Sequence, residues 1–125
     1  RYAKADLLSV QKKPKEALMM LDSILKDYNT NPIIDQVLLF QAQLYESQKQ
    51  YMKAASNYLQ IIKDHKKEIL VDDAYFFLAE LYRTHLEDLE KAKFNYESII
   101  FNHEDSIHFV EARHQYRILR GDLIN

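Results

Sequence analysis

Glu111 and His114 lie three residues apart and form the clearest candidate for chemistry in this 125-residue chain. On a helix their side chains share one face, as the Glu-x-x-His pairs of di-iron bundles do. Those bundles need a second such pair and two further carboxylates, and this sequence has no second Glu-x-x-His. We therefore expect both side chains to face solvent and predict no metal site.

The other reactive groups form no catalytic pattern. His103 and His108 flank a turn with Glu104 and Asp105, which could hold a stray cation without catalysing anything. No serine lies in a Gly-x-Ser-x-Gly elbow, because Gly121 is the single glycine. The absence of cysteine excludes thiolate nucleophiles, thiolate metal sites and disulfides. The sequence predicts a protein that is not an enzyme and binds no cofactor.

Composition excludes several other classes. The chain carries 17 basic and 19 acidic side chains, a net charge of -2, so it lacks the excess of Lys and Arg typical of nucleic-acid binding. With one glycine and two prolines, a β-rich fold or a phosphate-binding loop is not expected. No run of about 18 apolar residues predicts a membrane span.

Helices are the elements expected to position these residues. Pro14 suits a first helical position, Asn31 can cap a helix before Pro32, and Ser106 can cap a helix that stops at Gly121. In "DAYFFLAELY" (73–82), neighbouring Phe76 and Phe77 can both be buried only if the helix has neighbours on several sides. Apolar periodicity predicts seven helices, over residues 1–12, 14–28, 32–48, 51–64, 69–85, 88–102 and 106–120.

Small residues repeat along the chain at a fixed interval. One series, spaced by 37 and 37 residues, comprises Ala5, Ala42 and Ala79. A second, spaced by 37 and 38 residues, comprises Ala17, Ala54 and Ala92. We interpret each unit as a helix pair whose alanines lie where the two helices approach closely. Val37, Ala74 and Ala112 extend the register into the last helix, where Arg117 takes the position of Ala79.

These residues resemble the tetratricopeptide repeat family. Its first-helix pattern, W-x2-L-G-x2-Y, is similar to "YFFLAELY" (75–82) and "LLFQAQLY" (38–45), with Ala in place of Gly, and more weakly to "RYAKADLL" (1–8). Its second-helix pattern, A-x3-F, is similar to Ala54–Tyr58 and Ala92–Tyr96, and to Ala17–Leu21. The period exceeds the usual one, as in bacterial outer-membrane assembly lipoproteins and accessory proteins of the Tol-Pal system.

The resemblance implies an all-α, right-handed α-solenoid in one domain spanning residues 1–125. It would contain three helix pairs, about 1–30, 31–67 and 68–104, and a C-terminal capping helix within 105–121. Because the chain opens on Arg1 in a helical pattern, we expect it to be the C-terminal part of a longer protein. Cytoplasm and bacterial periplasm or envelope both remain open as its location.

The resemblance also implies a function as a scaffold that binds a protein or peptide on the concave face formed by the first helices. Chaperone-binding members hold a peptide's terminal carboxylates with Lys and Asn, whereas the equivalent positions here are Tyr2, Asp6, Phe40, Asp73 and Phe77. We therefore expect a segment with apolar and basic anchors rather than an acidic C-terminal peptide. The predicted groove residues are Tyr2, Asp6, Leu39, Gln43, Glu46, Phe76, Glu80, Arg83 and His114.

Two alternative roles stay open at this point. The chain could be a structural or self-assembly segment that stacks on upstream repeats or on a second copy, as a homodimer. It could also be a regulatory arm of a larger enzyme. Neither nucleic-acid binding nor direct membrane insertion is expected.

Overall fold

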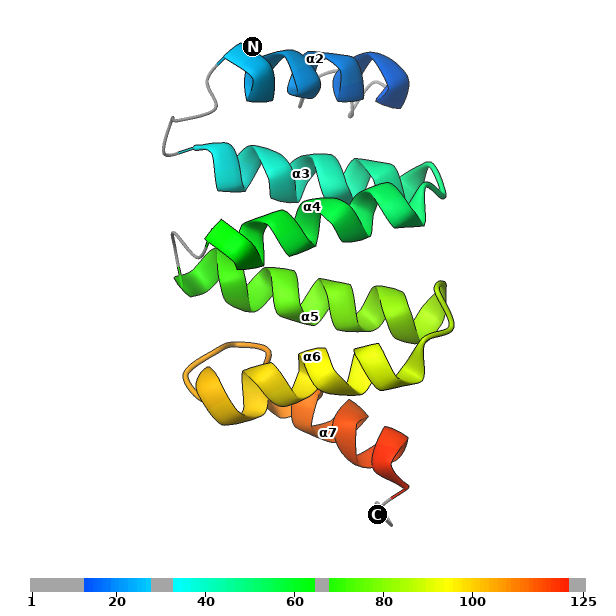
Figure 1. Cartoon of the computed structure of the whole chain (residues 1–125), viewed down its shortest axis with the longest axis vertical. Helices are drawn as coiled ribbons and strands as arrows, with labels where there is room; N and C mark the ends of the chain where they lie inside the picture. The colour runs from blue at the N-terminus through cyan, green and yellow to red at the C-terminus, as the bar shows by residue number, and fades with distance from the viewer. Residues whose placement is uncertain (1–12, 28–32, 65–67, 122–125) are drawn as a thin grey trace. The chain divides into compact units, whose positions relative to one another are not determined.

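The computed structural model describes residues 13–27, 33–64 and 68–121. Within them the fold is all-helical, with six helices and no strand (Figure 1). The helices are α2 (Pro14–Asp27), α3 (Ile34–Ser47), α4 (Tyr51–Asp64), α5 (Glu68–Thr84), α6 (Leu89–Asn102) and α7 (Phe109–Arg120). The predicted first helix, over residues 1–12, lies outside the described residues.

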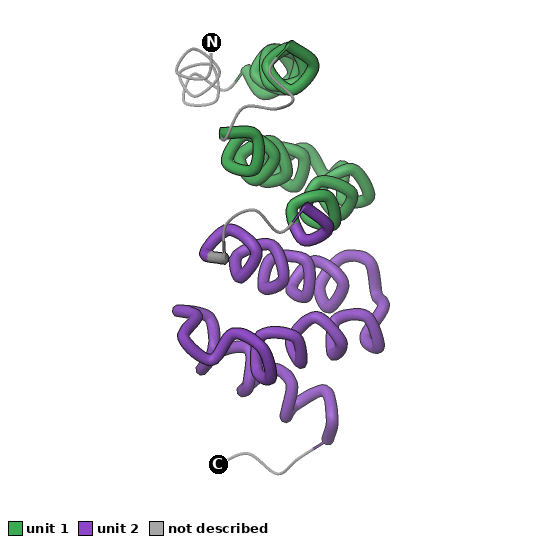
Figure 2. The backbone as a smooth tube through the Cα atoms, turned by 60° about the vertical axis from the view of Figure 1, so that its left-hand side comes forward, with its two compact units in different colours: residues 1–61 green, residues 62–125 purple. Residues whose placement is uncertain are grey.

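The helices group into two compact units, residues 1–61 and 62–125 (Figure 2). In the first unit, α2 packs against α3, and hydrogen bonds join α3 to α4. In the second unit, α5 packs against α6, and α6 against α7. Helices α5 and α6 run antiparallel to each other and are joined by a short connection (Figure 1).

The helix bounds recur at the interval expected from the alanine series. Helices α2, α4 and α6 begin at residues 14, 51 and 89, which are 37 and 38 residues apart, and each is 14 residues long. The alanines of both series that the structure describes are fully buried, namely Ala17, Ala42, Ala54, Ala79 and Ala92. Burial of a methyl group at these positions allows the close approach of paired helices.

The core of each unit is built around these alanines. In the first unit Ala17, Leu21 and Val37 are fully buried, with Met20 and Phe40 packed on the cluster. In the second, Ala79, Ala92, Tyr96, Ile99 and Ala112 form the buried cluster, with aromatic rings such as Tyr75 and Tyr82 packed against it. The segment 73–82 lies entirely in α5, as predicted, and has buried residues on more than one face.

Local sequence explains three of the helix ends. Pro14 is the first residue of α2. Asp88 caps α6, since its Oδ1 accepts a hydrogen bond from the Lys91 amide at 3.1 Å. Gly121 ends α7, as predicted, and adopts a left-handed conformation with a φ of +89° that favours glycine.

The start of α7 differs from the prediction. The helix begins at Phe109, with His108 at the N-cap position, and Ser106 lies in the preceding turn. The Ser106 hydroxyl accepts a hydrogen bond from the His108 amide at 3.0 Å, so it stabilises the turn instead of capping the helix. Asn31 and Pro32, the predicted start of α3, lie outside the described residues.

Candidate functional site

One face of α5 gathers three of the predicted groove residues of the second unit. Asp73, Phe76, Glu80 and Arg83 are spaced by three, four and three residues, which places them along a single stripe of the helix. All four are partly exposed. We call them the α5 stripe. Three of the four, Phe76, Glu80 and Arg83, were expected from the sequence to line a binding groove.

Tyr96 of α6 fixes the C-terminal half of the α5 stripe. Its ring is fully buried, and its hydroxyl donates a hydrogen bond to the Glu80 carboxylate. Arg83 donates from Nε to the Tyr96 hydroxyl at 3.1 Å and pairs with Glu80 at 2.7 Å. Burial raises the pKa of Tyr96, and the hydrogen bond to the Glu80 carboxylate raises it further, while Arg83 opposes the increase.

The first unit contains a similar arrangement. Tyr58 of α4, which is 38 residues before Tyr96, is fully buried and donates a hydrogen bond from its hydroxyl to the Glu46 carboxylate of α3. Burial and this hydrogen bond raise the pKa of the Tyr58 phenol. In both units the hydroxyl of a buried tyrosine therefore holds a glutamate carboxylate of the preceding helix through a hydrogen bond.

The loop between α6 and α7 covers the other end of the α5 stripe. His108 Nε2 lies 2.7 Å from Asp73 Oδ1, and His103 Nδ1 lies 2.7 Å from Asp72 Oδ1. The His108 ring also stacks on Phe76, with centroids 4.4 Å apart and planes inclined by 4°. Two Asp–His contacts and one ring stack thus connect residues 103–108 to α5.

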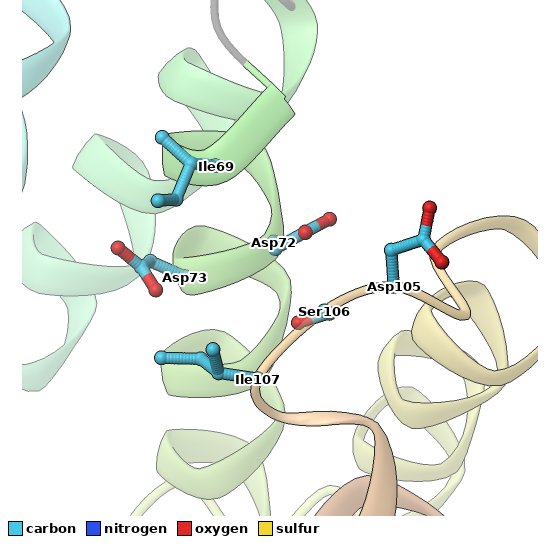
Figure 3. Close-up of a pocket in the computed structure, with 6 residues that line it drawn as sticks. All are labelled: Ile69, Asp72, Asp73, Asp105, Ser106 and Ile107. Carbon is cyan, nitrogen blue, oxygen red and sulfur yellow. The ribbon is translucent and has the colours of Figure 1, made fainter.

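An open hollow of about 230 Å³ lies between the first turns of α5 and this loop (Figure 3). The Asp72 side chain points from α5 toward the loop, while Ile69, Asp73 and Ile107 lie on the opposite side of the view. Ile69 and Ile107 are 66% and 84% exposed, which is high for large apolar side chains. The lining residues are Ile69, Asp72, Asp73, Asp105, Ser106 and Ile107, and we call this site the α5–loop hollow.

A second, more polar depression adjoins the hollow. It has a volume of about 320 Å³ and shares Asp72, Asp105 and Ser106 with the first. Asn102, His103 and Glu104 complete its lining. The carboxylates of Asp72, Asp73, Glu104 and Asp105 make this corner of the second unit acidic, and the two isoleucines add apolar surface.

The other predicted groove residues have varied surroundings. On α3, Leu39 is half-buried, Gln43 is exposed, and Glu46 is engaged by Tyr58. On α7, His114 is exposed. Tyr2 and Asp6 lie outside the described residues. The structure thus brings Phe76, Glu80 and Arg83 together on α5, and the residues on α3 belong to the other compact unit.

Several residues of the site were not expected from the sequence. Asp72 and Ile107 were given no role, and Asp73 was named only as a position where the chaperone-type carboxylate clamp is missing. His103 and His108 were considered only as possible ligands of a stray cation. The signal that could have found them is spacing along α5, because Asp73 lies one turn before Phe76 on the same stripe. The loop residues had no such signal, since their positions depend on contacts across 30 residues or more of sequence.

In the described part of the chain, no group of three or more His, Cys, Asp or Glu side chains is arranged to hold a metal ion. Glu111 and His114 are both exposed on α7. None of the six described helices combines the length and apolar content needed to cross a membrane.

Comparison with known proteins identifies no relative of this chain. No family model matches the sequence, and neither a curated protein nor a solved structure shows significant similarity to it.

Proposed function

We propose that the chain is a non-enzymatic protein-interaction module with a tetratricopeptide-like, right-handed α-solenoid architecture. The recurrence of helix starts at residues 14, 51 and 89 supports the repeated arrangement, as does the burial of the alanine series. The function follows from the surface that such repeats present, and the α5–loop hollow is the observation that carries it.

The partner is a protein segment with a basic side chain next to an apolar one. Three carboxylates line the α5–loop hollow, so a Lys or Arg head group entering it gains favourable charge interactions. Ile69 and Ile107 offer apolar surface at its edge for a neighbouring aliphatic or aromatic side chain. The α5 stripe continues from Asp73 along the helix and provides polar groups held by Tyr96 and His108.

Preorganisation supports this surface as a binding site. The hydrogen bonds from Tyr96 and Arg83 restrict the Glu80 side chain before a partner arrives. The stack of His108 on Phe76 similarly fixes the loop against α5. Less conformational entropy is then lost on binding than with mobile surface side chains.

The test is a fluorescence anisotropy titration with a labelled peptide that carries alternating Lys and Leu residues. Asp105 is exposed and lines both depressions, so Asp105→Lys alters their charge without disturbing the core. We expect this variant to bind the peptide about tenfold more weakly. The matched control is Glu16→Lys, an identical charge change at an exposed site of α2 in the other unit.

A second pair of variants tests the apolar contribution. Ile107→Ser removes an exposed side chain of the hollow, and Met52→Ser removes a similarly exposed one from α4. We expect weaker binding only for the first. If all four variants bind the peptide as the wild type does, or if Glu16→Lys weakens binding as much as Asp105→Lys, the hollow is not the docking site.

One observation favours a self-assembly role as a second candidate. Phe94 and Phe101 of α6 are 64% and 66% exposed and lie seven residues apart on the same helix face. Large exposed aromatic residues on one face are typical of interfaces. In light scattering, a wild-type molar mass that doubles as concentration rises would support this role, provided that the variant Phe94→Ser/Phe101→Ser stays monomeric. A wild-type mass that does not change with concentration would exclude it.

A further inference from the structure

Helix α7 presents three arginines on one exposed face. Arg113, Arg117 and Arg120 are all exposed, and their spacing of four and three residues places them within an arc of about 60°. We call them the α7 arginine face. Exposed Val110 lies beside it on the same helix, and exposed Ile118 lies about 100° further round. This concentration of positive charge contrasts with the net charge of -2 for the whole chain.

Aromatic rings hold two of these guanidinium groups in place. The Arg113 guanidinium carbon lies 5.4 Å from the centroid of the Phe109 ring, and that of Arg120 lies 5.1 Å from the Tyr116 centroid. Stacking of this kind restrains the guanidinium group and leaves its positive charge in place. The planar N–H donors of arginine suit carboxylates, which they can bind through two parallel hydrogen bonds.

The corresponding face of α5 is the one that receives a helix. In the register given by Ala74 and Ala112, the three arginines correspond to Tyr75, Ala79 and Tyr82. Ala79 is fully buried in the cluster that contains Ala92 and Tyr96 of α6. The α7 arginine face is therefore equivalent to the face of α5 on which a helix packs. Its three arginines favour a partner that carries negative charge.

We propose that the α7 arginine face binds an acidic amphipathic helix of another protein. Carboxylates spaced by three and four residues on that helix would match the three arginines, and an apolar residue beside them would contact Val110. A nucleic acid is disfavoured because three arginines on a chain of net negative charge provide a small electrostatic footprint. An anionic bilayer is disfavoured because Val110 and Ile118 are the only large apolar side chains that α7 exposes.

This inference goes beyond the proposed function and does not depend on the α5–loop hollow. The probe is a labelled, capped peptide of about 16 residues with Glu at positions i, i+4 and i+7 and Leu beside them. A peptide of the same composition in scrambled order controls for helical patterning. Binding is measured by fluorescence anisotropy with the full chain at low and at physiological salt.

The decisive variant is Arg113→Glu/Arg117→Glu, which reverses two exposed charges and leaves the buried face of α7 intact. We expect it to weaken binding of the acidic helical peptide by at least about tenfold. The matched control, Lys26→Glu/Lys63→Glu, makes the same charge change at exposed positions of α2 and α4 and should alter binding by less than about twofold. Circular dichroism verifies that both variants remain helical.

Four results would overturn the proposal. Equal weakening by both double variants would show that only net charge matters, and equal binding of the scrambled peptide would exclude a helical partner. Binding of anionic vesicles or single-stranded RNA that depends on Arg113 and Arg117, without binding of the acidic peptide, would assign the face to those ligands. Concentration-dependent self-association abolished by the arginine variant would identify a second copy as the occupant.

Discussion

Removing the Tyr96 hydroxyl should destabilise the second unit by a measurable and specific amount. The variant Tyr96→Phe keeps the fully buried ring and deletes the atom that bonds both Glu80 and Arg83. It therefore separates the hydrogen bonds from the packing, which a change to Ala would also destroy at a cost of about 3–5 kcal/mol.

The magnitude follows from the surroundings of the hydroxyl. Hydrogen bonds to charged groups contribute about 1.5–3 kcal/mol each. Glu80 and Arg83 remain paired with each other at 2.7 Å and are 30% exposed, so water can compensate in part for the lost hydroxyl. We expect Tyr96→Phe to lower the free energy of unfolding by about 1.5 kcal/mol, near the bottom of that range.

Urea unfolding monitored by circular dichroism at constant pH provides the measurement. Tyr116→Phe is the control, because the described structure gives that hydroxyl no hydrogen bond, and its effect should stay within about 0.5 kcal/mol. A double-mutant cycle with Glu80→Gln should return a coupling energy of about 1 kcal/mol. A change in Tyr96→Phe no larger than that in Tyr116→Phe would refute the reasoning.

Four further predictions concern α4, α6 and the connection between α5 and α6. Stability should fall as pH rises above about 10, where unfolded tyrosines ionise while Tyr58 and Tyr96, whose folded pKa values are raised, keep their protons; unfolding of Tyr58→Phe/Tyr96→Phe should show a shallower decline. Glu87→Gly should stabilise the chain by up to about 1 kcal/mol in urea melts, because Glu87 has a φ of +52°. Asp88→Ala should cost about 1 kcal/mol through loss of the cap on α6, and Asp88→Asn should restore part of it. Ala92→Leu should cost about 1–3 kcal/mol in thermal melts by overpacking a fully buried site, whereas Glu90→Leu, at an exposed one, should not.

Much of the helical framework could be predicted from the sequence, because its determinants are local. Apolar periodicity placed α4 at residues 51–64, and the alanine series predicted which small residues are buried. Gly121 marked the end of α7 because a left-handed cap favours glycine. The predicted fold class is confirmed as all-helical in the described residues; the solenoid arrangement stays a proposal.

The site was less accessible to sequence reasoning, because its contacts join residues far apart in the chain. Glu80 and Arg83 were placed on the correct helix, but periodicity does not show that Tyr96 of α6 reaches them. Tyr96 occupies the position that is usually phenylalanine in the A-x3-F pattern. Its hydroxyl, once buried, needs a hydrogen-bond acceptor, and this could have pointed to a nearby carboxylate. Nothing local indicated that His103 and His108 would lie against Asp72 and Asp73, or that Ser106 would support a turn.

Residue-resolved NMR with the basic Lys/Leu peptide tests the proposed docking site most directly. Amide shifts of the isotope-labelled chain during titration report where the peptide lies. The proposal predicts that the largest changes fall in residues 69–83 of α5 and in residues 103–108. Changes concentrated on α2, α3 or α4, or no changes at saturating peptide, would contradict it.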